Sequence, residues 1–257
     1  MESLNFKNKS IYVIGGSGLI GYEVSKLLSF NGAKVLILDI KNNNKNKINF
    51  FKFEITKNLY QNQKNLETVF KIYGVPDGMI NCSYPKNKNW EKSSFSKINY
   101  KNFDENIDLH LKSYVWLAKT FAEKMKYKKK KGKIIQLSSI YGILGQDLSI
   151  YKKTNMSENM MYPLIKGGIG SFTRQMASYY GKYNITINNL CPGGVLEIRK
   201  GKKKQNKNFL KNYSNKVPLC RLANSEEIAR VAVFLLSNYS DYITGQDIIV
   251  DGGWSII

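Results

Sequence analysis

Histidine and cysteine are scarce in this chain of 257 residues. The single histidine is His110, and the three cysteines, Cys82, Cys191 and Cys220, stand far apart. Zinc sites need several histidines and cysteines at short spacings, and a disulfide framework normally uses an even number of cysteines. The sequence therefore predicts no metal site, and the cysteines are expected to be reduced, buried thiols of a cytoplasmic protein.

Long apolar runs are also missing. The first short run, SIYVIGG at residues 10–16, follows a polar start, and no stretch approaches the roughly 20 apolar residues that span a bilayer. This pattern indicates neither export nor membrane insertion. No linker-like composition interrupts the chain, so residues 1–257 are expected to form one domain with one large core.

Acidic residues are few, because 19 Asp and Glu stand against 40 Lys and Arg, for a net charge of +21. Such a surplus can attract nucleic acid, an anionic membrane surface or anionic substrates. Here lysine accompanies frequent Asn, Ile and Tyr, the residues that A+T-rich coding DNA favours, so most of the charge is expected to be solvated surface. No aromatic-plus-basic repeat or recognition-helix pattern indicates nucleic-acid binding.

Short apolar runs bounded by turn residues recur along the chain and predict seven strands. They cover residues 11–15, 34–39, 50–55, 78–82, 133–138, 185–190 and 247–252. Helix-period segments lie between them, most clearly at residues 19–32, 103–125 and 225–238; the last begins with Asn224 and Glu227, spaced as in a capping box. This alternation predicts an α/β fold, a Rossmann-type doubly wound parallel sheet with helices on both faces.

Three glycines, Gly15, Gly18 and Gly21, follow the first expected strand and open the first expected helix. Glycine at these positions allows a tight turn and a close approach of the backbone to a pyrophosphate. Asp39 ends the second expected strand, 18 residues after Gly21, where a carboxylate can accept hydrogen bonds from a ribose. A carboxylate there repels a 2′-phosphate, which favours NAD over NADP. The nearby lysines that keep NADP as the alternative are Lys41, Lys45 and Lys47.

Tyr162 and Lys166 stand four residues apart, which places both side chains on one face of a helix. An ammonium near a phenol lowers the phenol's pKa from about 10 towards working pH, so that Tyr162 can exchange the proton of an alcohol. Three stretches accompany this pair: LSSIYG at 137–142, NLCPGG at 189–194, and the closing segment from PLCRLANSEEIARV to IIVDGG at 218–253. Together these motifs resemble the single-domain short-chain dehydrogenases/reductases over essentially the whole chain.

The resemblance implies a catalytic set. Ser139 orients and polarises the substrate carbonyl, Tyr162 is the general acid and base, and Lys166 tunes Tyr162 and holds the nicotinamide ribose. Asn81 matches the first residue of the family's Asn-Asn-Ala-Gly stretch. The cofactor-binding residues implied are Gly15, Ser17, Gly18, Leu19, Ile20, Gly21, Asp39, Ile40, Glu54, Ile55, Asn81, Cys82, Ser83, Tyr162, Lys166, Pro192, Gly193 and Val195.

The chain also departs from the family pattern. Tyr84 stands where the family usually has glycine, which adds bulk near the cofactor, and Glu197 stands where a threonine is common. Twenty-three positions separate Ser139 from Tyr162 (162 − 139), and the extra segment at 145–160 is expected to form part of a substrate wall.

His110 occupies the position where most family members have a catalytic Asn that bends the helix and holds a water. An imidazole both donates and accepts and titrates near neutrality, so His110 is expected to join the catalytic proton relay. Two alternatives remain open. In the first, His110 is an ordinary half-buried histidine. In the second, Asn106, one turn earlier, has the role of the family's catalytic Asn.

A narrower resemblance is to the branch of flagellin-modification and surface-polysaccharide oxidoreductases, linked to nonulosonic-acid and amino-sugar pathways. It implies an NAD-dependent enzyme that interconverts a secondary alcohol and a ketone on a sugar phosphate or nucleotide sugar, as a homotetramer or homodimer without nucleic-acid or membrane partners. The alternatives are an NADPH-dependent 3-oxoacyl-thioester reductase and a non-catalytic NAD-binding regulatory or nucleic-acid-binding protein. Residues 195–217 are expected to form a substrate lid. Its cations, candidates for a substrate phosphate or merely solvated, are Arg199, Lys200, Lys202, Lys203 and Lys204.

Overall fold

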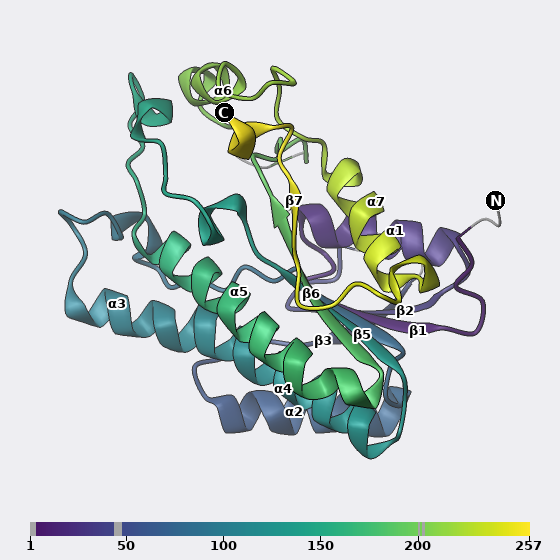
Figure 1. The fold of residues 1–257 in the computed structure, drawn as a ribbon. Helices are drawn as coiled ribbons and strands as arrows, with labels where there is room; N and C mark the ends of the chain where they lie inside the picture. Colours follow the sequence, from purple (N-terminus) through teal and green to yellow (C-terminus); the bar gives the residue numbers. More distant parts are fainter. Residues whose placement is uncertain (1–3, 44–47, 200, 202–203) are drawn as a thin grey trace.

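A parallel sheet forms the centre of the computed structural model, which describes residues 4–43, 48–199, 201 and 204–257 (Figure 1). Its strands are β1 (Ser10–Ile14), β2 (Lys34–Asp39), β3 (Asn49–Lys52), β4 (Gly78–Asn81), β5 (Gly132–Leu137), β6 (Ile185–Pro192) and β7 (Asp247–Val250). They lie in the order β3-β2-β1-β4-β5-β6-β7, and every pairing is parallel. The order reverses between β1 and β4, which is where such sheets bind ligands. The doubly wound fold predicted from the sequence is confirmed.

Helices cover both faces of the sheet (Figure 1). They are α1 (Leu19–Phe30), α2 (Leu59–Tyr73), α3 (Tyr100–Asn106), α4 (Lys112–Tyr127), α5 (Met161–Tyr180), α6 (Lys207–Ser214) and α7 (Ser225–Leu236). Successive strand residues point to opposite faces, so Tyr12 packs with α2, α4 and α5, whereas Val13 packs with α1 and α7. The domain is therefore two apolar layers separated by one sheet.

Three strands end two or more residues away from the sequence expectation, and one of them is β7, which stops at Val250 rather than at residue 252. β3 stops at Lys52 rather than at residue 55, because its neighbour β2 ends at Asp39, and the bond from the Phe53 amide to the Asp39 carbonyl is the last between them. β6 continues to Pro192, two residues further than expected, because Val250 of β7 pairs with it there. All three differences lie at the carboxyl edge of the sheet.

The periodicity of residues 103–125 predicts one regular α-helix, but the segment is interrupted. A π-helical turn, Ile107–Leu111, separates α3 from α4 and carries His110. Such turns insert an extra residue into the helical ladder and are frequent at functional sites. The expected capping box is present, since Asn224 and Glu227 begin α7, and Asn31 caps the carboxyl end of α1.

The three cysteines are free, and Cys191 is buried as expected. Cys220 is exposed, so the expectation of three buried thiols is wrong. Its amide donates to the Val217 carbonyl across a tight turn at 2.7 Å, in a segment on the surface before α7. In the described part of the chain, no helix has the length and hydrophobicity to cross a bilayer.

Candidate active site

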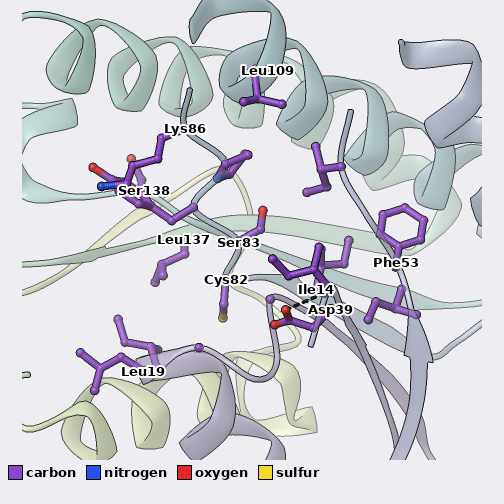
Figure 2. A pocket seen from close by; sticks show the side chains of 18 of the residues that line it. Ile14, Leu19, Asp39, Phe53, Cys82, Ser83, Lys86, Leu109, Leu137 and Ser138 are labelled. Carbon is purple, nitrogen blue, oxygen red and sulfur yellow. Dashed lines mark hydrogen bonds between the residues drawn. The ribbon is translucent and has the colours of Figure 1, made fainter. Parts of the chain in front are cut away.

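A cavity of about 1090 Å³ opens at the carboxyl edge of the sheet, on both sides of the switch between β1 and β4. Its walls include residues at or just after the ends of β1, β2, β3, β4, β5 and β6, in order Ile14, Asp39, Phe53, Cys82, Ser138 and Pro192. Figure 2 shows the first five of these side chains around the cavity. Segments far apart in the sequence therefore meet at one site.

The glycine-rich turn brings backbone close to this cavity. Gly15 has φ +72°, and a Cβ on it would lie 2.7 Å from the amide nitrogen of Ser83. A Cβ on Gly21 would lie 2.2 Å from the carbonyl oxygen of Gly15. Only glycine allows this turn to pack against both the β4 loop and α1, whose first residues Leu19 and Ile20 line the cavity. The first-turn amides of a helix lack helical acceptors, so this cradle fits a diphosphate.

Asp39 is fixed beside this turn by backbone amides. Its carboxylate accepts hydrogen bonds from the Ser17 amide at 2.9 Å and the Ile40 amide at 2.7 Å. Glu54 lines the same end of the cavity. A carboxylate held in this way can accept from ribose hydroxyls, which fits NAD. The Lys41 side chain is exposed and outside the lining, and Lys45 and Lys47 lie outside the described residues.

Tyr162 and Lys166 both face the cavity from α5, as their spacing predicts. The Lys166 Nζ lies 5.8 Å from the centroid of the Tyr162 ring, and it donates a hydrogen bond to the Leu137 carbonyl at 2.7 Å. Ser139 is buried just after β5, and hydrogen bonding from its side chain lowers the pKa of Tyr162. The three side chains implied as catalytic are therefore together.

The pKa of Tyr162 does not move as the sequence predicts. Burial raises it, and the hydrogen bond from Ser139 offsets only part of this rise. Burial also lowers the pKa of Lys166 to about 7. Burial is the largest influence on both groups, and it disfavours the phenolate of Tyr162 and the ammonium of Lys166. Tyr162 consequently holds its proton at neutral pH, which suits a general acid for ketone reduction, and alcohol oxidation requires the proton to leave.

His110 lies in an aromatic enclosure behind the cavity wall. Its ring centroid is 5.4 Å from that of Tyr84, 5.3 Å from that of Tyr114 and 6.0 Å from that of Trp90. The side chain is fully buried, and neither ring nitrogen has a hydrogen-bond partner among the described residues. Burial, reinforced by the charge of Lys166, lowers the pKa of His110 well below its usual range. The expectation that His110 titrates near neutrality is therefore wrong.

Asn106, the alternative to His110, is engaged elsewhere. Its amide donates to the Asn102 carbonyl at 2.9 Å and to Asn87 Oδ1 at 3.2 Å. These bonds tie the end of α3 to the loop that follows β4.

Most cofactor-binding residues implied by the family line the cavity. They are Gly15, Gly18, Leu19, Ile20, Asp39, Ile40, Glu54, Ile55, Cys82, Ser83, Tyr162, Lys166, Pro192, Gly193 and Val195. Ser17, Gly21 and Asn81 instead lie behind the lining, where the side-chain oxygen of Asn81 accepts from the Ser83 amide and hydroxyl. Ser139 and His110 likewise stand behind their neighbours Ser138 and Leu109.

Sequence reasoning missed several lining residues. Phe53, Thr56, Lys57, Lys86 and Leu109 line the cavity without belonging to any motif. Each is within a few residues of a recognised position, and that adjacency is the only signal that could have found them.

Tyr84 forms an aromatic wall beside the Tyr162 ring. Its centroid lies 6.0 Å from that of Tyr162 and 5.6 Å from that of Trp90. The bulk predicted from this departure therefore lies directly against Tyr162.

The extra segment at 145–160 packs against α6 of the expected lid. Asn208 and Asn212 donate to the carbonyls of Lys153 and Lys152 at 2.7 and 2.8 Å, and Tyr151 stacks on Phe209. Of the expected lid cations, Arg199 lines the cavity, where Glu197 holds its guanidinium through Nε and Nη2. Lys204 is exposed and outside the lining, and Lys200, Lys202 and Lys203 lie outside the described residues.

Comparison with known proteins finds relatives over nearly the whole chain. A family described as enoyl-(acyl carrier protein) reductase matches residues 17–255. Post-translational flagellin modification protein A of Campylobacter coli is 30% identical over 97% of this chain and 99% of its own. A 3-oxoacyl-(acyl-carrier-protein) reductase of Chlamydia muridarum is 30% identical over 96% and 97%. The crystal structure of a short chain dehydrogenase from Leptospira borgpetersenii with bound NAD+ is 29% identical, with a TM-score of 0.83 over 98% of this chain and 94% of that one.

Proposed function

The chain belongs to the short-chain dehydrogenase/reductase family and is an oxidoreductase acting on CH–OH groups, and from that membership we propose that it is an NAD-dependent enzyme interconverting a secondary alcohol and a ketone on a sugar derivative. The sugar derivative is a sugar phosphate or a nucleotide sugar. The observation that carries the proposal is that Tyr162, supported by Ser139, and Lys166 face the same cavity as Asp39. Similarity over nearly the whole chain to a flagellin modification protein supports the choice of a sugar derivative.

NAD fits this cavity through the chain's own groups. The turn of Gly15 and Gly18 and the start of α1 would hold the diphosphate, Asp39 the adenosine ribose, and Pro192 with Gly193 the nicotinamide side. When bound, the nicotinamide supplies or accepts the hydride. Asp39 supports NAD over NADP, because its fixed carboxylate would repel a 2′-phosphate.

The chain's residues would handle the proton and the developing charge. The Ser139 hydroxyl donates to the substrate oxygen, the Tyr162 hydroxyl gives its proton to that oxygen during reduction, and the Tyr162 phenolate takes the proton of the alcohol during oxidation. Lys166 positions the ribose and replenishes the proton of Tyr162. His110 is the next group in this relay, as a neutral imidazole that donates from one ring nitrogen and accepts at the other.

The enzyme acts on a small molecule in the cytoplasm, and it assembles as a homodimer or homotetramer through α4 and α5. The substrate lid comprises residues 195–217, of which α6 is the described helix.

A second candidate is an NADPH-dependent 3-oxoacyl-thioester reductase, which the relative from Chlamydia muridarum favours. A spectrophotometric screen separates the two. The purified protein is assayed with NAD+ and NADP+ against sugar phosphates and nucleotide sugars, and with NADH and NADPH against acetoacetyl thioesters. We expect NAD+ reduction with a sugar derivative. Turnover of acetoacetyl thioesters with NADPH alone would establish the second candidate instead.

A further inference from the structure

Four cationic side chains line the cavity within the described part of the chain. They are Lys57, Lys86, Lys166 and Arg199. Lys166 belongs to the catalytic set. The other three differ in how firmly a neighbouring carboxylate holds them, and this difference decides which one is available to an anionic ligand.

Two of the three are held by shielded carboxylates. Arg199 makes bonds through Nε and Nη2 to Glu197, whose side chain is 19% exposed. Lys57 lies 3.0 Å from Glu105, which is 26% exposed and also accepts a bond from Asn87. Such pairs, bidentate or supported by a further donor, lose more when they are broken than a simple exposed pair.

Lys86 is held much more weakly by its carboxylate partner, Glu91. Its ammonium is 3.0 Å from Glu91, whose side chain is 83% exposed, and an ion pair in water contributes little. Its remaining contact is with the ring of Tyr84, whose centroid lies 5.9 Å from Nζ. Lys86, labelled in Figure 2 among the lining residues, therefore combines a place in the cavity with a charge that a ligand can take over.

The position of Lys86 relates it to the reacting groups. The Tyr84 ring centroid is 5.9 Å from the Lys86 ammonium and 6.0 Å from the Tyr162 ring centroid. The Tyr84 ring therefore contacts both the Lys86 ammonium and the ring of Tyr162. A ligand of monosaccharide size can bridge them, with its carbinol at Tyr162 and its anionic group at Lys86.

We infer that Lys86 is a specificity-determining residue that binds the phosphate of the substrate, with Tyr84 as the wall between that phosphate and the reacting carbon. This inference rests on the proposed function and narrows it, because it makes the substrate a phosphate-bearing sugar and assigns the phosphate to the β4 loop rather than to the cations of the lid. The phosphate is either a monoester or the diphosphate of a nucleotide sugar.

The test is equilibrium binding by calorimetry to protein saturated with NAD+, with glucose, glucose 1-phosphate and UDP-glucose as probes. Wild-type protein should bind the phosphate-bearing probes more tightly than glucose, and the tighter of the two identifies monoester or diphosphate. Lys86→Gln should weaken that binding about tenfold or more, the size expected for one charge-assisted hydrogen bond. Glu91→Gln should strengthen it, because it removes the competing carboxylate.

Lys88→Gln is the matched control, since Lys88 is exposed on the same loop and outside the lining. It removes the same charge and should change nothing. Equal phosphate affinity in the Lys86 and Lys88 variants, or no preference of wild-type protein for phosphate, would overturn the inference alone. A parallel loss of NAD+ affinity in Lys86→Gln would assign Lys86 to the cofactor instead. Failure of wild-type protein to bind NAD+ would overturn the proposed function as well.

Discussion

Single residues set the proton chemistry of the site, and His110 is the least ordinary of them. Burying an imidazole without a protein partner for either nitrogen costs free energy, and its position on a π-helical turn near Lys166 suits a relay. We predict that His110→Ala lowers turnover about tenfold and changes its pH profile while leaving NAD affinity nearly intact. Steady-state kinetics across pH, with NAD binding measured separately, would check this. Unchanged turnover would remove His110 from the mechanism.

The buried ammonium of Lys166 lowers the free energy of unfolding. Its pKa falls from 10.5 unfolded to about 7 folded, so between these values the unfolded chain binds more protons and the free energy of unfolding rises with pH. The penalty is largest below pH 7, where the buried ammonium is charged. We predict that Lys166→Met abolishes activity but raises the free energy of unfolding by about 2 kcal/mol at pH 6. Denaturant titrations of both proteins at pH 6 and pH 10 measure the free energy of unfolding. A variant less stable than wild type at pH 6 would contradict this account.

At the scale of elements, the turn between β1 and α1 is the most tightly packed part of the site. A Cβ on Gly21 would lie 2.2 Å from the Gly15 carbonyl oxygen, within backbone that cannot yield without moving the helix. We predict that Gly21→Ala weakens NAD binding at least tenfold, because α1 must shift from the diphosphate. Gly145→Ala is the control, since a Cβ there meets nothing within 4 Å. Equal NAD affinity in both variants would show that the turn does not hold the cofactor.

Elements were predictable from the sequence where local pattern and tertiary environment agree. The buried strands β1, β2 and β4 coincide with apolar runs, and the spacing of Asn224 and Glu227 predicts the cap of α7. The apolar spacing of residues 103–125 fits an ordinary helix and does not predict the π-helical turn around His110; only the family resemblance, which implies a bend at that position, indicated an irregularity there. The early end of β3 depends on where its neighbour stops, which no local pattern records.

At the scale of the whole molecule, the site is a product of strand order. Six strands end at one edge, so glycines near residue 15, a carboxylate at 39 and a tyrosine at 162 meet although the chain separates them widely. The sequence located those residues because their types and spacings are constrained by cofactor chemistry. It did not find Lys86 or Phe53, whose places depend on loop conformation, and it gave the wrong direction for the Tyr162 pKa, which depends on burial.

Turnover by Tyr162→Phe, with NAD affinity measured on the same sample, tests the central claim most directly. Phenylalanine keeps the ring that packs against Tyr84 and removes only the exchangeable proton. Loss of that proton should lower turnover by about 10² to 10⁴, the usual contribution of general acid–base catalysis, with NAD affinity nearly unchanged. Turnover equal to wild type would contradict the account, because the alcohol proton would then pass through another group.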